Sequence, residues 1–130
     1  MESDCSQSFR IPPRHRGNSL ARVKVCYEAE WDPTSLAASL RKATVWVENI
    51  ATNDIQVNVL VQFKVSGNAH VLGACPVAAH YQTLKPDEEW SCTPDTHVSF
   101  HRPAIVQATA DVTISGQRTR TLKTDARRIG

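Results

Sequence analysis

The clearest pattern along the chain is a strict alternation of apolar and polar residues over positions 55–65, IQVNVLVQFKV. The apolar residues at every second position are Ile55, Val57, Val59, Val61, Phe63 and Val65. Polar residues stand between them, with Leu60 as the exception. A period of two is typical of a β-strand with one face in a core and one in water. The pattern predicts a long half-buried strand here.

A second strand is expected just before it. Residues 42–48 alternate less cleanly, with Ala43, Val45 and Val47 opposite Trp46. The segment 49–54, NIATND, then offers Asn and Asp residues, whose side chains bond the local backbone and tolerate turn conformations. Together these features predict a β-hairpin over 42–65 with a loop of about four to six residues.

Three more segments follow the same logic. Residues 21–31, ARVKVCYEAEW, and residues 104–116, AIVQATADVTISG, alternate over most of their length. In the first of these, Cys26 falls on the polar face, so it does not have the pattern of a core cysteine. Residues 97–100, HVSF, predict a shorter strand that stops before Pro103, because proline cannot donate to a strand ladder.

One segment favours a helix. In WDPTSLAASLRK, Asp32 suits the N-cap, Pro33 suits the first helical position, and Leu36 and Leu40 lie four apart on one face. We expect about two helical turns, which would connect the strand at 21–31 to the hairpin.

Residues 43–90 resemble immunoglobulin-like sandwich modules of bacterial envelope proteins. In such modules a strand ending in Asn, here Asn49, leads into a long alternating strand, and a turn of the type Leu-x-Pro-acidic precedes the next strand, here LKPDEEW at 84–90. Asp87 departs from the pattern because glycine is common at that place. The resemblance implies a sandwich and says little about function, since one fold hosts many roles.

The expected fold is therefore mainly β: a single antiparallel β-sandwich, immunoglobulin-like or jelly-roll-like, with one short connecting helix and extended basic terminal arms. The division predicted is an extended N-terminal arm at 1–19, a sandwich body at 20–116 and a basic C-terminal tail at 117–130. Pro12 and Pro13 favour extended backbone that cannot join a central strand, which suits an arm.

Charge is segregated along the chain although the net charge is only +2. The two ends are basic, and the body between them is acidic. Basic ends would be drawn to the acidic body of a neighbouring subunit, to nucleic acid, or to solvent alone as solubilising tails. The candidate partner-contact residues are Arg10, Arg14, Arg16, Trp46, Arg118, Arg120, Arg127 and Arg128.

The four cysteines and five histidines allow two kinds of site. Zinc is disfavoured because His97 and His101, both outward on one short strand, would lie about 13 Å apart, too far to share one ion. Cys75 and Cys92 bracket a proline-containing loop, and a disulfide between them would close about 17 residues. Four free thiols are the alternative, and four cysteines allow three connectivities. No metal and no cofactor are expected.

Catalytic motifs are not visible in the sequence. It contains no G-x-S-x-G, no phosphate-binding glycine loop and no H-E-x-x-H. The acidic run 87–89 follows a proline and has the pattern of a solvated turn. Trp31, Trp46 and Trp90 could form a ligand platform, or pack under the segment 66–90. No enzyme is expected.

The pattern favours a non-catalytic structural or assembly protein, a β-sandwich subunit that self-associates or attaches to a larger particle such as a virus or phage capsid through its terminal arms. Other protein subunits are the expected partners, with a homo-oligomer or larger assembly as the form and the virion as the place. A secreted or envelope binding and adhesion module stabilised by disulfides is the alternative, at the cell surface or outside it. Weak nucleic-acid binding through the basic arms comes next. No membrane partner is expected, since no segment is long and apolar enough to span a bilayer and no apolar signal region is present at the N-terminus.

Overall fold

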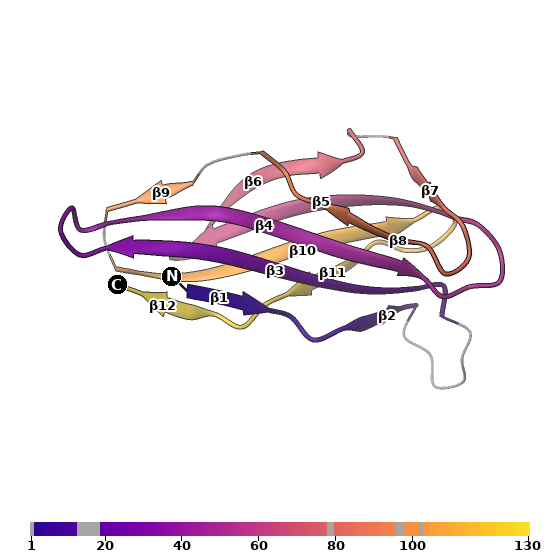
Figure 1. Cartoon of the computed structure of the whole chain (residues 1–130), viewed down its shortest axis with the longest axis horizontal. Helices are drawn as coiled ribbons and strands as arrows, with labels where there is room; N and C mark the ends of the chain where they lie inside the picture. The colour runs from indigo at the N-terminus through magenta and orange to yellow at the C-terminus, as the bar shows by residue number, and fades with distance from the viewer. Residues whose placement is uncertain (1, 13–18, 78–79, 96–97, 102) are drawn as a thin grey trace.

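Two antiparallel sheets make up the fold (Figure 1). The computed structural model describes residues 2–12, 19–77, 80–95, 98–101 and 103–130. Sheet I consists of β1 (Glu2–Cys5), β2 (Phe9–Ile11), β3 (Ala21–Asp32), β4 (Ala37–Asn49), β8 (Glu89–Cys92) and β9 (Ser99–Phe100). Sheet II consists of β5 (Ile55–Val65), β6 (Asn68–Cys75), β7 (Gln82–Leu84), β10 (Ala104–Ile114), β11 (Arg120–Lys123) and β12 (Arg127–Ile129). The mainly β class expected from the sequence is confirmed.

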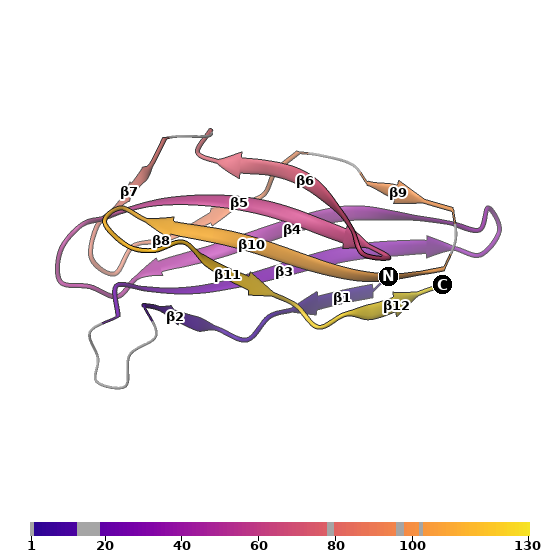
Figure 2. The same ribbon diagram turned by 180° about the vertical axis from the view of Figure 1, so that it is seen from behind.

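The sheets lie face to face around one core, the arrangement of a β-sandwich (Figure 2). The apolar face of each long strand is buried, as the period of two predicts, and β5 alternates buried and more accessible residues over its whole length. Tyr27 of sheet I and Phe63 of sheet II meet edge to face in the core, with ring centroids 5.4 Å apart. The strands expected at 21–31, 55–65 and 104–116 are confirmed.

The hairpin predicted over 42–65 is wrong. Both strands form, but β4 pairs with β3 and β8 in sheet I while β5 pairs with β10 and β6 in sheet II. The link between them crosses from one sheet to the other. An alternating pattern shows that a strand has a core face, but two facing strands in opposite sheets carry the same pattern as two paired neighbours. The alternation therefore could not identify the pairing.

Asn49 explains why the crossing forms at this point. Its side chain is fully buried at the end of β4. The side-chain amide donates to the carbonyl oxygens of Asn53 and Leu84, at 3.0 and 2.9 Å, and its carbonyl oxygen accepts from Ala51 N at 2.8 Å. These bonds satisfy backbone groups of the link that would otherwise be buried without partners.

The short helix expected after Asp32 is also wrong. Residues 33–36 form a turn, and β3 and β4 are joined directly as a long hairpin. Asp32 does bind the following residues, through Thr34 N and the hydroxyl of Ser35, each at 2.9 Å. The same bonds serve a tight turn as well as a helix N-cap, and Leu36 adopts a left-handed φ of +53° that ends any helix. Alternating burial resumes at Ala38 and Leu40.

The predicted terminal segments are built into the sheets. Residues 2–5 and 9–11 pair with β3, and residues 120–123 and 127–129 pair with β10. Ile11 and Ile129 are buried in the common core. The described part of the segment 1–19 is therefore an edge of sheet I, because β3 would otherwise leave its backbone groups unpaired. Pro13 and the rest of residues 13–18 lie outside the described residues.

Candidate functional site

The outer face of the β3–β4 pair carries a ladder of charged side chains. Three cross-strand ion pairs lie along it: Arg22–Glu48 at 3.0 Å, Lys42–Glu28 at 3.9 Å, and Arg41–Glu30. Arg22 with Glu48 and Lys42 with Glu28 are direct register partners on two antiparallel strands. Arg41 instead stands where the register shifts and reaches Glu30, whose register partner is Ser39. The acids and bases of this face therefore largely neutralise one another.

Trp46 interrupts the ladder near its centre. Its register partner is Lys24 on β3, and on its other side it stands beside Ser91 of β8. The side chain is 38% exposed, on the opposite face from the buried Val45 and Val47. Lys24 is thus the base on this ladder whose partner across the strands is an aromatic ring and not a carboxylate.

Shallow hollows flank Trp46 on both sides. One, of about 210 Å³, is lined by Ser8, Arg22, Val23, Lys24, Trp46, Val47, Glu48 and Glu89. The other, of about 260 Å³, is lined by Ser3, Cys5, Cys26, Tyr27, Glu28, Lys42, Thr44 and Trp46. The indole ring therefore stands between two depressions, each with charged groups at its rim. Such a surface can take an apolar group of a partner against the ring and hydrogen-bond polar groups around it.

The three tryptophans do not form one platform. Trp90 is paired with Val47 and packs against the core, so it points away from the face that carries Trp46. Trp31 lies at the far end of β3, opposite Ala38, and also packs against the core. Trp46 alone of the three belongs to the outer face of sheet I.

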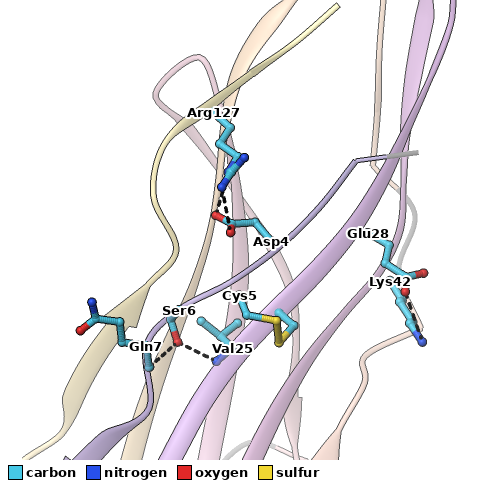
Figure 3. Close-up of a disulfide and its surroundings, with 9 residues drawn as sticks. Asp4, Cys5, Ser6, Gln7, Val25, Glu28, Lys42 and Arg127 are labelled. Atoms are coloured by element: carbon cyan, nitrogen blue, oxygen red, sulfur yellow. Dashed lines mark hydrogen bonds and ion pairs between the residues drawn. A yellow bond between two sulfur atoms is a disulfide. The ribbon is translucent and has the colours of Figure 1, made fainter.

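A disulfide joins Cys5 to Cys26 across the edge of sheet I (Figure 3). The two residues are direct register partners on β1 and β3. The position of Cys26 on the polar face of its strand is thereby explained, since an outward cysteine on β3 meets an outward cysteine on the neighbouring strand. Ser6 continues the attachment, because its hydroxyl accepts from Val25 N at 3.0 Å. Sequence reasoning missed this pair, although the outward Cys26 was its signal.

The second disulfide joins Cys75 on β6 to Cys92 on β8. These are the two cysteines for which the sequence suggested a bridge. Because β6 is in sheet II and β8 is in sheet I, the bond links the two sheets along one side of the sandwich. With both bonds formed, no cysteine of the chain is free.

The other predicted contact residues are all arginines of the two ends of the chain. Arg10, Arg118 and Arg128 are exposed, and Arg120 is half-buried. Arg127 instead binds Asp4 of the same chain, with its Nε 3.1 Å from Asp4 Oδ2 (Figure 3). The hydrogen bond and negative charge of Asp4 raise the pKa of Arg127. Arg14 and Arg16 lie outside the described residues. Of the described arginines in this set, Arg127 is thus engaged within its own chain.

Candidate metal ligands stay apart in the part of the chain that the structure describes. No three His, Cys, Asp or Glu side chains there converge on a point that could hold an ion. Cys75 and Cys92 are joined to each other, and His97 is not among the described positions. The acidic residues 87–89 are exposed where the chain enters β8, and Asp87 has a φ of +66°, the conformation that commonly selects glycine there. No helix among the described residues is long and apolar enough to cross a membrane.

Comparison with known proteins supports the fold alone. No protein-family model matches the chain, and no curated protein matches it. Among solved structures, a structural-genomics target named SoR45 superposes with a TM-score of 0.50 at 16% identity, over 84% of each chain. A putative ApaA protein from Bordetella pertussis gives a TM-score of 0.50 at 12% identity, over 84% of this chain and 91% of that one. At such identities the likeness extends to the two-sheet architecture and not to function.

Proposed function

We propose that this chain is a non-catalytic structural protein, a β-sandwich subunit that associates with further protein subunits in the manner of a capsid or virion component. One observation carries the proposal: Trp46 stands exposed in the middle of an otherwise charge-paired sheet face. Tryptophan is the residue type most enriched at the energetic centres of protein interfaces.

The surroundings of Trp46 suit such a centre. The flanking ion pairs already satisfy most of the charges on the face, so a partner does not have to neutralise each of them. Lys24 stands beside the ring with no acid opposite it in the register. A partner surface that offers an apolar group to Trp46 and a carboxylate to Lys24 would complement this spot.

The finer fold proposed is immunoglobulin-like and not jelly-roll-like. The strand order β3-β4-β8 in sheet I faces the order β11-β10-β5 in sheet II. The strands β3, β4 and β8 correspond to strands A, B and E of an immunoglobulin-like sandwich, and β11, β10 and β5 correspond to G, F and C. The strand β1 is added at the edge beyond β3. The link from β4 to β5 corresponds to the crossing between the second and third strands of that arrangement.

A secreted or envelope binding module is a second candidate, and the disulfides favour it. Disulfides persist in oxidising places, among them extracellular spaces, the periplasm and virion surfaces. Both bonds fasten edge strands, β1 in one case and β6 with β8 in the other. The candidates share the setting and the surface around Trp46, and they differ in whether the partner is a copy of this chain.

Nucleic-acid binding through the ends receives less support. Arg127, one of the basic residues of the ends, is engaged with Asp4 of its own chain. Such binding would also weaken steeply with added salt, which makes it simple to recognise in a titration.

Sedimentation equilibrium of the wild-type chain and of Trp46→Ala tests the proposal. We expect concentration-dependent association of the wild type that the substitution weakens by about tenfold or more, the range typical of an interface centre. Leu36→Ala is the matched control, because it removes an exposed apolar side chain in the β3–β4 turn, away from the hollows. Equal weakening by both substitutions, with unchanged thermal stability, would assign no special role to Trp46.

A further inference from the structure

One stretch of this chain carries no charged residue. From Val65 to Leu84 there is no Asp, Glu, Lys or Arg, although 22% of the whole chain is charged. We call residues 65–84 the uncharged strip. It holds β6 and β7 of sheet II. Three large apolar side chains in it are exposed: Val71 at 59%, Val77 at 69% and Tyr81 at 44%. Exposed apolar side chains in a stretch without charged residues are typical of a region that a protein covers by binding. The charge beside this stretch in the ladder is Lys64 of β5, the register partner of Ala69.

β6 also presents an edge of sheet II. Along its length β6 pairs with β5, and the order of the sheet ends there. Ser66 and Gly67 form the two-residue turn before it, both with positive φ, +49° and +86°. In such a hairpin the pair next to the turn, Val65 with Asn68, exchanges backbone hydrogen bonds, and bonded and non-bonded pairs then alternate. The backbone groups of Ala69 and Val71 are therefore directed away from β5.

Several other edge strands of the sandwich carry charged residues, whereas the short strands β7 and β9 carry none. β1 carries Asp4, β8 carries Glu89, and β12 carries Arg127 and Arg128. Charged side chains on an edge strand oppose the addition of a further strand, and natural sheets use them for that purpose. The first four residues of β6, Asn68–Val71, lack this protection, and all four are exposed.

We infer that a second copy of this chain docks against β6, with the two Asn68–Val71 segments antiparallel across a two-fold axis through His70. In that register Ala69 of one copy stands opposite Val71 of its partner, and each such pair exchanges two backbone hydrogen bonds. Their side chains share the outer face of sheet II, so Val71 covers the partner's Ala69. Sheet II then continues from one copy into the next.

The uncharged strip favours a second copy over a partner of another kind. A two-fold interface places each patch against itself, so any charged residue near the axis would face its own like charge. A strip without charged residues avoids that repulsion. The same strip offers no charge that could attract an oppositely charged partner. The inference rests on the proposed function and names one of its interfaces, since a two-fold contact at β6 combined with a different contact around Trp46 would build an assembly larger than a dimer.

Hydrogen exchange at low and high protein concentration, together with sedimentation equilibrium at the same concentrations, tests the inference. We expect the amides of Ala69 and Val71 to be protected only at high concentration. Ala69→Pro removes an outward donor without removing a bond to β5, and Val71→Lys adds a charge at the edge. Each should weaken dimerisation by about tenfold or more, since a tenfold change needs only about 1.4 kcal/mol. Ile105→Lys is the matched control, an exposed apolar residue on β10 outside the strip.

The outcomes separate the two proposals. Exchange at Ala69 and Val71 that does not depend on concentration would overturn the docking at β6. An assembly weakened by Trp46→Ala but unaffected by both β6 variants would also overturn it, while leaving the proposed function in place. A wild-type chain that stays monomeric at every concentration would overturn both. If Val71→Lys fails to fold, Ala69→Pro and the exchange measurement on the wild type still decide the matter.

Discussion

The carboxylate of Asp4 on β1 binds the guanidinium of Arg127 on β12, 3.1 Å away and 123 positions along the chain. β1 lies at one edge of sheet I, and β12 pairs with β10 near the matching edge of sheet II. The ion pair therefore closes the sandwich on the side opposite the Cys75–Cys92 disulfide. One edge is fastened by a covalent bond and the other by a charge pair.

The side chain of Arg127 is exposed, whereas that of Asp4 is largely buried. Because solvent screens the pair from the side of Arg127, it should contribute modestly to stability and should respond to salt. Asp4→Asn should lower the melting temperature slightly in low salt and by less in high salt. The raised pKa of Arg127 means that its contribution is complete below the ordinary arginine value and is lost only as pH rises above it. Titration of Arg127 should therefore not change stability near neutral pH. Thermal melts at two salt concentrations check this, and an equal loss at both would contradict it.

The two disulfides should stabilise the fold by similar amounts. They close separations of 21 and 17 residues, for which chain entropy gives about 3 kcal/mol each. Urea unfolding of Cys5→Ser/Cys26→Ser and of Cys75→Ser/Cys92→Ser measures both values. The two pairs should differ in accessibility, because Cys5 is exposed and Cys92 is buried. Under mild reductant, mass spectrometry with alkylation should find Cys5 and Cys26 labelled first, and the reverse order would contradict the structure.

Asn49 should be intolerant of substitution although it lies far from any proposed contact. Asn49→Ala would leave buried backbone groups near Asn53 and Leu84 without partners, at about 1–3 kcal/mol for each group. Asn53→Ala serves as the control, because only the backbone oxygen of Asn53 takes part. Urea unfolding of both variants measures the difference. A loss at Asn49 no larger than that at Asn53 would show that the amide does not hold the crossing.

Acid should loosen the β3–β4 turn as Asp32 becomes protonated. Hydrogen bonds from the Ser35 hydroxyl and the Thr34 amide lower the pKa of Asp32 below its ordinary value of 3.8. Because the pKa of Asp32 is lowered in the folded state, its stabilisation is complete above the ordinary value of 3.8. The stabilisation is lost as the pH falls through the lowered folded-state pKa. Carboxyl chemical shifts of Asp32 from pH 5 to pH 2 follow the titration. Asp32→Asn should remove this local pH dependence, and a midpoint at or above the ordinary value would contradict the bonding.

Alternation in the sequence predicted the long strands because burial on one face decides their composition. β3, β5 and β10 each bury the face that the alternating residues indicate, and β10 buries Thr109 in addition. It could not say which strands pair, so β4 and β5 were expected in one hairpin although a buried Asn49 sends them to opposite sheets. Pairing depends on contacts between distant segments that no local pattern encodes.

The missed edges have a similar cause. β1, β2, β11 and β12 have three or four residues each, too few for alternation to emerge. Asp32 followed by Pro33 is compatible with a helix start and with a tight turn, and the pairing of β3 with β4 decides for the turn. The exposure of Trp46 could be stated only as one of two alternatives, because it depends on what lies over its face. The uncharged strip was present in the sequence as a gap in charge between Lys64 and Lys85.

Association of the chain with itself is the claim on which the rest depends, and sedimentation equilibrium of the full chain across a wide concentration range tests it most directly. A single chain has a mass of 14.4 kDa. We predict an apparent mass that rises with concentration to at least twice that value, with the rise weakened in Trp46→Ala. A mass that stays at that of one chain at every concentration would contradict the assembly function.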